Sequence, residues 1–335
     1  MIISRTPFRI SIAGGGTDFP EWFIENQSVV VSGTIDKYSY ITCRNLENFF
    51  NHNYRIVYSL IENKMDIDEI EHPSVRAILK YLRYPNGLEI HHDGDLPART
   101  GLGSSSAFTV GLINIINKLN FNEISKKELS NMAIYVERNI MNENVGMQDQ
   151  IACAYGGINR VDFYYENGEP SYFVKPLILT QAKLKEISNN IALVYTGIQR
   201  YSSKINEHLV TTLKNPSKKN KKLNIRNVEL AMMTEEILTR ESDLNSLADI
   251  FEESWHIKEQ LNPDSVTEHL RSIKKLGIEN GSLGAKILGA GGGGFIAFWV
   301  PSLNREKFSL AFKNFIVTNF NFETEGSKII YNEGN

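Results

Sequence analysis

Cysteine is scarce in this sequence of 335 residues. Its two cysteines, Cys43 and Cys153, are too few and too far apart in sequence for a disulfide framework or a zinc site. Long apolar runs are also missing, because charged or polar residues interrupt every such stretch well before the roughly 18 residues that cross a membrane. The first residues, MIISRTPFRISI, lack the apolar run and cleavage site of a secretory signal. We therefore expect a cytoplasmic protein without a membrane partner.

A large net charge is absent as well. The 36 basic and 39 acidic residues leave a formal charge of −3, which gives no global attraction to nucleic acid or to an anionic membrane. A hydrophobic content of 41% is ordinary for a globular protein, and the length suggests two domains. No internal repeat is visible, which excludes solenoids and propellers. We expect small-molecule partners and no nucleic acid, while a homo-oligomer remains compatible with the sequence.

Alternating apolar residues predict strands in the first hundred positions. Phe8, Ile10 and Ile12 alternate with Arg9 and Ser11, which predicts a strand with one buried face. The other segments predicted here are strands at 28–33, 38–44, 55–60 and 88–92 and helices at 108–119 and 126–140.

The second half of the chain has a different pattern. A polar segment at 165–176 places a boundary near it, and we expect domains at 1–180 and 181–335. Basic residues at 214–222 predict an exposed, helix-breaking loop rather than an anion site. The remaining predicted elements are a strand at 191–196, helices at 225–240, 244–260 and 265–276, and a glycine-rich turn at 284–294 before a strand with the sequence FIAFWV.

The stretch LPARTGLGSSSAF, which begins at Leu96, has the composition of a phosphate-binding loop. Glycines let backbone N–H groups turn toward an anion, and the start of a helix adds a positive dipole. The Walker A loop needs a lysine after its last glycine, but Gly103 precedes Ser104. The dinucleotide fingerprint needs a third glycine where Ser106 stands. A serine-capped helix start and, less favourably, a serine nucleophile without the usual elbow remain alternatives.

Two carboxylates follow this loop. Glu137 lies on the flank of the apolar face of the helix predicted at 126–140, either at a solvated edge or directed into a cleft. Asp149, in GMQDQ, could cap a helix or accept the proton of an attacking hydroxyl near a phosphate loop.

Four ordered motifs resemble those of the GHMP kinases, a superfamily that includes galactokinase, homoserine kinase and mevalonate kinase. They are residues 6–18, 97–107, 146–150 and 289–294, and together they span nearly the whole chain. The resemblance implies an α+β, two-domain GHMP kinase fold, with an N-terminal domain like the second domain of ribosomal protein S5 and a ferredoxin-like C-terminal domain. It also implies an active site between them.

Within the superfamily, the segments GGGTD, IDKY, MQDQ and VYTGIQR resemble the D-glycero-D-manno-heptose 7-phosphate kinases most. This implies an ATP- and Mg²⁺-dependent sugar 1-kinase whose product feeds nucleotide-heptose synthesis for surface polysaccharide. A kinase for a free sugar such as L-fucose, or a non-catalytic nucleotide- or sugar-binding regulator of the same fold, are the alternatives.

The resemblance also implies roles for single residues. The ATP phosphates would be held by Arg99, Gly101, Leu102, Gly103, Ser104, Ser105 and Ser106. Ser105 and Glu137 would ligate Mg²⁺, which accepts a sparse protein ligand set. Asp149 would contact the attacking hydroxyl as base or orienting group, and Arg9 would compensate charge.

The acceptor side is implied in the same way. Gly16, Thr17, Asp18 and Asp149 would bind the sugar, and Arg200 is a candidate anchor for its distal phosphate. Asp18 could alternatively be a turn residue that follows the three glycines, and Arg9 could be an exposed strand residue. Gly289 and the glycines up to Gly294 would pack close to the nucleotide loop, or form a flexible hairpin.

One position departs from the family pattern. Arg99 stands where many members have glycine, so we expect a loop conformation open to a side chain there, and we hypothesise that Arg99 adds charge to a phosphate site.

Overall fold

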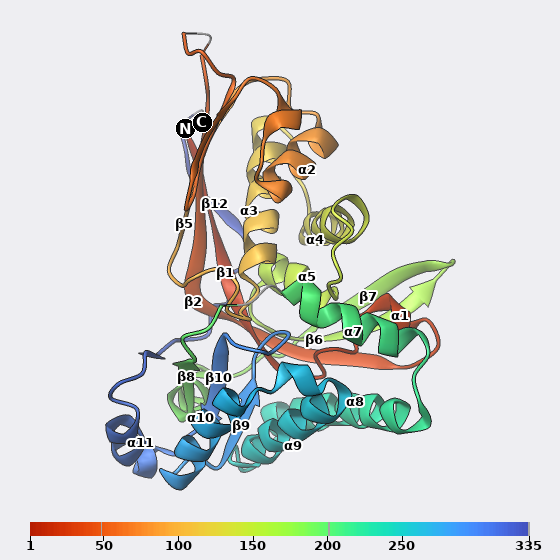
Figure 1. Cartoon of the computed structure of the whole chain (residues 1–335), viewed down its shortest axis with the longest axis vertical. Helices are drawn as coiled ribbons and strands as arrows, with labels where there is room; N and C mark the ends of the chain where they lie inside the picture. Colours follow the sequence, from red (N-terminus) through yellow and green to blue (C-terminus); the bar gives the residue numbers. More distant parts are fainter. Residues whose placement is uncertain (48, 200–201, 334–335) are drawn as a thin grey trace.

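The computed structural model describes residues 1–47, 49–199 and 202–333, with only the backbone for 202–205. Two sheets organise the chain (Figure 1). The larger sheet has the order β12-β1-β2-β5-β3-β4, and β6 and β7 continue it from β2. Its strands are β1 (Ile2–Ala13), β2 (Ser28–Asn45), β3 (Tyr54–Val57), β4 (Ile61–Lys64), β5 (Leu88–Gly94), β6 (Ile158–Glu166), β7 (Glu169–Pro176) and β12 (Lys328–Asn332).

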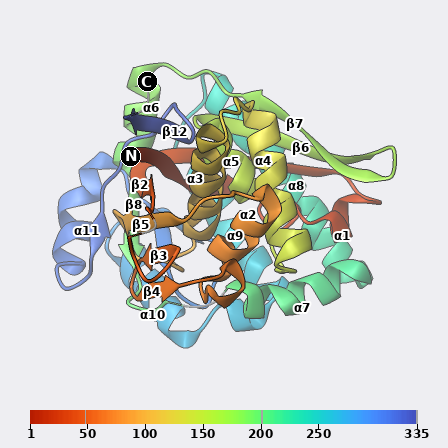
Figure 2. The ribbon, with the colours of Figure 1, turned by 90° about the horizontal axis from the view of Figure 1, so that it is seen from above.

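Helices cover one face of this sheet, as the view from above shows (Figure 2). They are α2 (Pro73–Leu82), α3 (Ser104–Leu119), α4 (Lys126–Tyr135) and α5 (Gln148–Tyr155), with the short α1 (Pro20–Phe23) after β1. A π-helical turn, Val136–Ile140, follows α4. Helix α3 packs on β1 and β2 because its apolar residues, Val110 and Leu112 among them, are fully buried.

The smaller sheet has the order β11-β8-β10-β9 and is antiparallel. Numbered along the chain this order is 4-1-3-2, the arrangement of a ferredoxin-like domain. The strands are β8 (Ile191–Tyr195), β9 (Gly284–Ile287), β10 (Phe295–Trp299) and β11 (Val317–Thr318). The helices of this half are α6 (Gln181–Asn190), α7 (Ser202–Lys214), α8 (Lys218–Thr239), α9 (Ser246–Leu261), α10 (Glu268–Glu279) and α11 (Arg305–Ala311).

The two halves pack through α8 and α9. Helix α9 packs on β9, and α8 packs on α9 and on β1 and β2 of the larger sheet. The chain then returns, because β12 pairs with β1 and the two termini lie side by side (Figure 1). The fold is thus α+β and of the two-domain type expected, while the division at residue 180 stays a prediction.

Three local expectations are wrong. Strand β1 is buried on both faces from Pro7 to Ala13, because α3 covers one face and α8 packs on the same strand. Strand β2 runs unbroken through both of the strands expected at 28–33 and 38–44. The segment 218–222 is helical, because the Ser217 side chain caps the start of α8 and exposed lysines are good helix formers.

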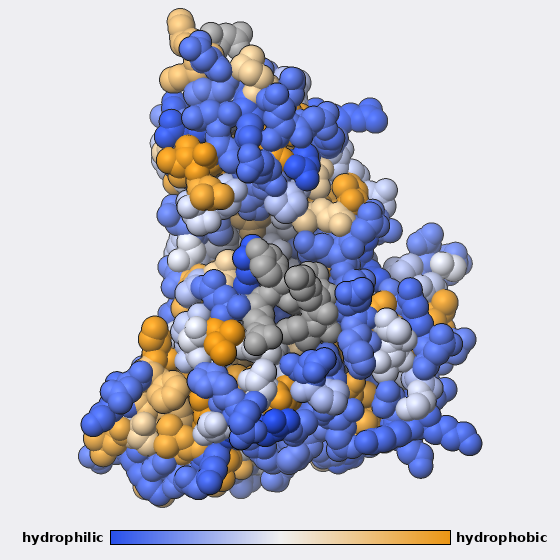
Figure 3. Space-filling model, in the orientation of Figure 1, coloured by the Kyte–Doolittle hydropathy of each residue, from blue (hydrophilic) through white to orange (hydrophobic). Residues whose placement is uncertain are grey.

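The face seen in Figure 3 is mostly hydrophilic, and apolar side chains gather at its lower end over α11. In the described residues, no helix is both long and apolar enough to span a bilayer.

Candidate active site

A cavity of about 880 Å³ lies where the two halves meet. Strand β1, the loop before α3 and the start of α5 line it from the larger sheet, and α8, α9 and the loop after β9 line it from the other half. This volume is near the upper end of the roughly 300–1,000 Å³ of ligand pockets, so it has room for a nucleotide and a second small molecule.

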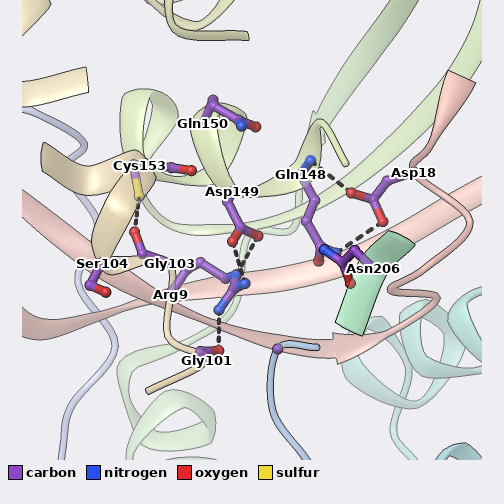
Figure 4. Close-up of polar contacts among 12 residues, drawn as sticks. Arg9, Asp18, Gly101, Gly103, Ser104, Gln148, Asp149, Gln150, Cys153 and Asn206 are labelled. Carbon is purple, nitrogen blue, oxygen red and sulfur yellow. Dashed lines mark hydrogen bonds and ion pairs between the residues drawn. The ribbon is translucent and has the colours of Figure 1, made fainter. Parts of the chain in front are cut away.

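Arg9 and Asp149 face each other at the wall of this cavity (Figure 4). Arg9 Nε donates to Asp149 Oδ1 at 2.8 Å, and Nη2 donates to Oδ2 at 2.5 Å. The third guanidinium nitrogen, Nη1, donates to the Gly101 carbonyl at 2.7 Å. The Arg9 side chain is only 3% exposed, while that of Asp149 is 27% exposed. Arg9 is therefore not a surface arginine: it fixes Asp149 and the glycine loop relative to each other.

The glycine loop ends at the start of α3. Gly103 occupies the N-cap position with φ 77°, and no side chain caps the helix there. The serine-cap interpretation is therefore wrong, because the first serine is already inside the helix. The first N–H groups of a helix without a capping side chain are a favourable site for an anion. The Ser104 hydroxyl instead accepts from the Arg99 backbone N–H at 3.1 Å.

Arg99 has a left-handed backbone conformation. Its φ is 63°, in the region that glycine adopts most readily and that other residues adopt less often. The side chain is exposed at the rim and lines the cavity. A left-handed conformation at a residue other than glycine costs backbone free energy, which the rest of the loop must offset.

The second glycine-rich segment packs directly on the first. A Cβ on Gly289 would lie 2.4 Å from Gly101 Cα, and one on Gly294 would lie 2.3 Å from the Thr100 carbonyl oxygen. The Phe295 backbone N–H also donates to that carbonyl at 3.1 Å. Only glycine permits this approach, so residues 289–294 brace the loop, as the sequence led us to expect.

Glu137 points into a buried pocket behind the loop. Its Oε2 accepts from the Ser106 hydroxyl at 3.0 Å and from Gln150 Nε2 at 2.5 Å. Its Oε1 and the Thr109 hydroxyl are both buried and have no partner within 3.5 Å, although the Thr109 hydroxyl is near enough to lower the pKa of Glu137. Burial raises the pKa of Glu137 to about 7, although the neighbouring donors oppose that shift.

The donor set around Glu137 fits Mg²⁺. A carboxylate oxygen with no partner within 3.5 Å, next to the Ser106 hydroxyl, supplies the hard oxygen ligands that this ion prefers. The serine in contact with Glu137 is Ser106, whereas Ser105 is exposed at the cavity. Among the residues described, no three His, Cys, Asp or Glu side chains are grouped so as to hold a metal. An ion here would therefore depend on phosphate oxygens and water as well.

The GGGTD segment forms a tight turn after β1. The Thr17 hydroxyl donates to the Gly14 carbonyl at 2.8 Å and accepts from Ser28, so Thr17 closes the turn. Asp18 is 1% exposed and accepts from the Gly16 N–H and from both the backbone and the side chain of Gln148. Burial raises the pKa of Asp18. Gly16 and Asp18 line the cavity beside Asp149.

Several cavity residues were missed by sequence reasoning. Polar residues among them are Asn224, Ser254, Lys258 and Lys286, which come from α8, α9 and β9. An aromatic wall stands at the other end, where His72 stacks on Phe108 with ring centroids 4.8 Å apart. The one available signal was Lys286 in the apolar strand GAKI. Arg200 lies outside the described residues.

Comparison with known proteins identifies the arrangement. The model of the GHMP kinases N terminal domain matches residues 72–157, and that of the GHMP kinases C terminal domain matches residues 233–316. The chain belongs to the GHMP kinases. This GHMP kinase is an ATP-dependent phosphotransferase with an alcohol acceptor.

Relatives of this GHMP kinase include sugar kinases. The D-glycero-alpha-D-manno-heptose 7-phosphate kinase of Campylobacter jejuni is 28% identical over 98% of each chain. The bifunctional fucokinase/GDP-fucose pyrophosphorylase of Arabidopsis thaliana is 24% identical over 86% of this chain and 29% of that protein. In structure, the D-glycero-D-manno-heptose 1-phosphate kinase from Bacteriodes thetaiotaomicron aligns over 99% of this chain and 100% of its own, with a TM-score of 0.79 and 22% identity.

Proposed function

We propose that this GHMP kinase transfers the γ-phosphoryl group of ATP to the anomeric hydroxyl of D-glycero-D-manno-heptose 7-phosphate, giving the 1,7-bisphosphate and ADP. The observation that carries the transfer step is the position of Arg9, whose guanidinium holds both the Asp149 carboxylate and the Gly101 carbonyl. The choice of sugar is supported by the full-length relative from Campylobacter jejuni.

Asp149 would accept the hydrogen bond of the attacking hydroxyl and then its proton. The O–H bond breaks, a bond forms between the sugar oxygen and the γ-phosphorus, and ADP leaves with the bridging oxygen. An anomeric hydroxyl is more acidic than an ordinary alcohol, so a carboxylate that is already bonded to Arg9 is basic enough for this role. Arg9 also supplies a fixed positive charge next to the phosphates.

The phosphate loop would hold ATP with backbone N–H groups of residues 101–106 and with the Arg99 side chain. The aromatic wall of His72 and Phe108 would lie against the base. Glu137, Ser105 and Ser106 are the residues that would hold Mg²⁺. Bound Mg²⁺ would offset the negative charge on the phosphate oxygens.

Gly16 and Asp18 would position the sugar beside Asp149. The Asp18 carboxylate already accepts three hydrogen bonds, yet two oxygens offer about four acceptor sites, so a sugar hydroxyl can still donate to it. Thr17 would act through the turn that it closes rather than by contact.

A substrate panel tests this proposal. ADP release is measured with D-glycero-D-manno-heptose 7-phosphate, with the unphosphorylated heptose and with L-fucose, each at several concentrations. We expect the heptose 7-phosphate to have the highest kcat/KM. A higher kcat/KM for L-fucose would favour the free-sugar kinase, which the fucokinase relative supports.

A further inference from the structure

Two lysines of the cavity wall have no role in the chemistry described above. Lys258, on α9, is half-buried, and its Nζ donates to the Gly289 carbonyl at 2.5 Å. Lys286, on β9, is 6% exposed. Because strand side chains alternate, Lys286 faces away from its apolar neighbours Ala285 and Ile287, which pack in the core behind the smaller sheet. Both lysines line the cavity.

Positive groups outnumber negative ones around these lysines, and Asp18 is the acidic group that acts on Lys258. The groups that act on Lys286 are Lys258 and Arg9, both positive. Arg9 and Asp18 act on Lys258, and Arg9 is already bound to Asp149. Burial lowers the pKa of Lys258 to about 8 and that of Lys286 to about 7. Two ammonium groups placed together in a buried wall are costly unless an anion joins them.

Neutral hydrogen-bonding groups surround the same part of the cavity. Asn224 is 0% exposed, and both its amide nitrogen and its amide oxygen lack a hydrogen bond. Ser254 is 5% exposed, and its hydroxyl also has no partner. Ser254 and Lys258 are four residues apart on α9, so they share one face of the helix. Buried polar groups of native proteins rarely remain without hydrogen bonds, which marks these as ligand contacts.

We infer that Lys258, Lys286, Asn224 and Ser254 form a subsite for a second anionic group of the acceptor, a phosphate distant from the hydroxyl that is phosphorylated. This inference rests on the proposed function and deepens it, because it assigns the substrate to the sugar phosphates rather than the free sugars. The lysines match the charge of a phosphate dianion, and the amide and hydroxyl complete its hydrogen bonds. They take the place that the sequence led us to expect for Arg200.

Steady-state kinetics with a matched pair of sugars tests the subsite. KM and kcat are measured for D-glycero-D-manno-heptose 7-phosphate and for the same heptose without phosphate, in the wild type, Lys286→Met and Lys258→Met. For the phosphorylated sugar we expect each variant to raise KM by roughly 10–100-fold, the usual loss for one hydrogen bond to a charged group. In Lys286→Met the kcat, the KM for ATP and the KM for the unphosphorylated sugar should stay nearly unchanged, whereas Lys258→Met also removes a hydrogen bond to the Gly289 carbonyl, so its KM for ATP is measured as well.

Lys274→Met is the control, because this lysine of α10 is partly buried but pairs with Glu252 and stacks over Trp255. Methionine replaces a buried cation with an apolar chain of similar length, so we expect the test variants to fold, and melting temperatures check this. Ser254→Ala removes a neutral hydroxyl rather than a charge, so it should raise the KM for the heptose 7-phosphate less than the lysine variants do. Variants that keep the wild-type preference for the phosphorylated sugar would overturn the subsite while leaving the proposed function standing.

If the wild type phosphorylates no sugar phosphate, the proposed function is wrong. A direct binding measurement then tests the phosphate subsite independently of that function. Calorimetry with D-mannose 6-phosphate and with D-mannose, in the presence of ADP, then addresses the subsite alone. The subsite would be supported if the wild type binds D-mannose 6-phosphate more tightly than D-mannose and Lys286→Met abolishes this difference. Equal affinity for both sugars would overturn it.

Discussion

Arg9 and Asp149 form a two-point hydrogen-bonded pair between the central strand β1 and the start of α5, with N–O distances of 2.8 and 2.5 Å. The same arginine reaches the Gly101 carbonyl. The buried guanidinium of Arg9 therefore sets the distance between the Asp149 carboxylate and the glycine loop, which we propose to bind the ATP phosphates. Such an arrangement provides positioning without any movement at the time of transfer.

Replacing Asp149 by asparagine should separate chemistry from nucleotide binding. Asparagine keeps the size of the side chain but cannot take a proton, so we expect kcat to fall by about 10²–10⁴-fold while the Kd for ATP changes little. Asp162→Asn is the control, because Asp162 also makes a two-point pair with an arginine, Arg160, on β6 outside the cavity. Parallel losses of ATP binding and kcat in Asp149→Asn would instead assign this aspartate a structural role.

Gly289→Ala should damage the nucleotide site through backbone contact alone. Its Cβ would lie 2.4 Å from Gly101 Cα, so the loop must shift, and we expect the KM for ATP to rise by about tenfold or more. Gly168→Ala is matched in backbone conformation, with φ 84° against 65°, but its Cβ would meet nothing within 4 Å. Both variants should lose about 1–2 kcal/mol of unfolding free energy from the left-handed conformation. The KM for ATP should change only in Gly289→Ala, and an equal rise in both would refute the bracing role.

Two substitutions at Arg99 separate its charge from its backbone strain. Arg99→Gly relieves the conformation at φ 63° and should stabilise the protein by about 1 kcal/mol, whereas Arg99→Ala keeps the strain. Because the side chain is exposed, we expect either variant to raise the KM for ATP only about two- to fivefold. Thermal melts and ATP titrations measure the two effects. If neither the KM for ATP nor that for the sugar phosphate changes in Arg99→Ala, the charge has no part in either site.

The buried lysines predict a pH dependence. Burial holds the pKa of Lys286 at about 7 and that of Lys258 at about 8, and a bound phosphate would favour the charged ammonium and raise both values. Above pH 7 the free protein must take up protons to bind the sugar phosphate. The KM for that substrate should therefore rise with pH between 7 and 9, by at most about tenfold per pH unit for each proton. The unphosphorylated heptose should show no such rise, and a rise of the same size for both sugars would contradict the assignment.

The stability of the free protein should follow the opposite trend. A lowered pKa in the folded state means that the unfolded chain binds more protons between pH 7 and the ordinary lysine value of 10.5. The contribution of Lys286 to the unfolding free energy therefore becomes more favourable as pH rises above 7. Lys286→Met should remove this increase, which thermal melts of the two proteins at pH 7 and pH 9 would detect.

The sequence predicted best where a motif is local. Residues 101–103 form the loop before α3, which begins at Ser104, and Arg9 lies on a strand where the alternation predicted one. Asp149 lies in the first turn of α5, close to the helix start that its motif indicated. The contact between Arg9 and Asp149 could be predicted only through the resemblance to the GHMP kinases, because the two residues are 140 positions apart in sequence.

Long-range packing explains what the sequence could not predict. Helices α3 and α8 pack on β1 and bury both of its faces. Both helices lie far from β1 in sequence, so the residues near β1 could not indicate this burial. Lys258 lies on an amphipathic helix where a lysine is normally solvated. It is half-buried here, because α8 packs on α9 and the ammonium donates to the Gly289 carbonyl in the loop after β9. Lys286, the charged residue in the otherwise apolar strand GAKI, is a local signal that could have indicated the proposed phosphate subsite, but no prediction was made from it.

Locating the new phosphate on the sugar product tests the proposed phosphorylation of the anomeric hydroxyl most directly. The enzyme is incubated with ATP and D-glycero-D-manno-heptose 7-phosphate, and the product is followed by phosphorus NMR. We expect a second sugar phosphate signal that is coupled to the anomeric proton and grows in equal amount with ADP, while the original 7-phosphate signal persists. A new phosphate coupled to any other carbon of the sugar, or ADP formed without a sugar bisphosphate, would contradict it.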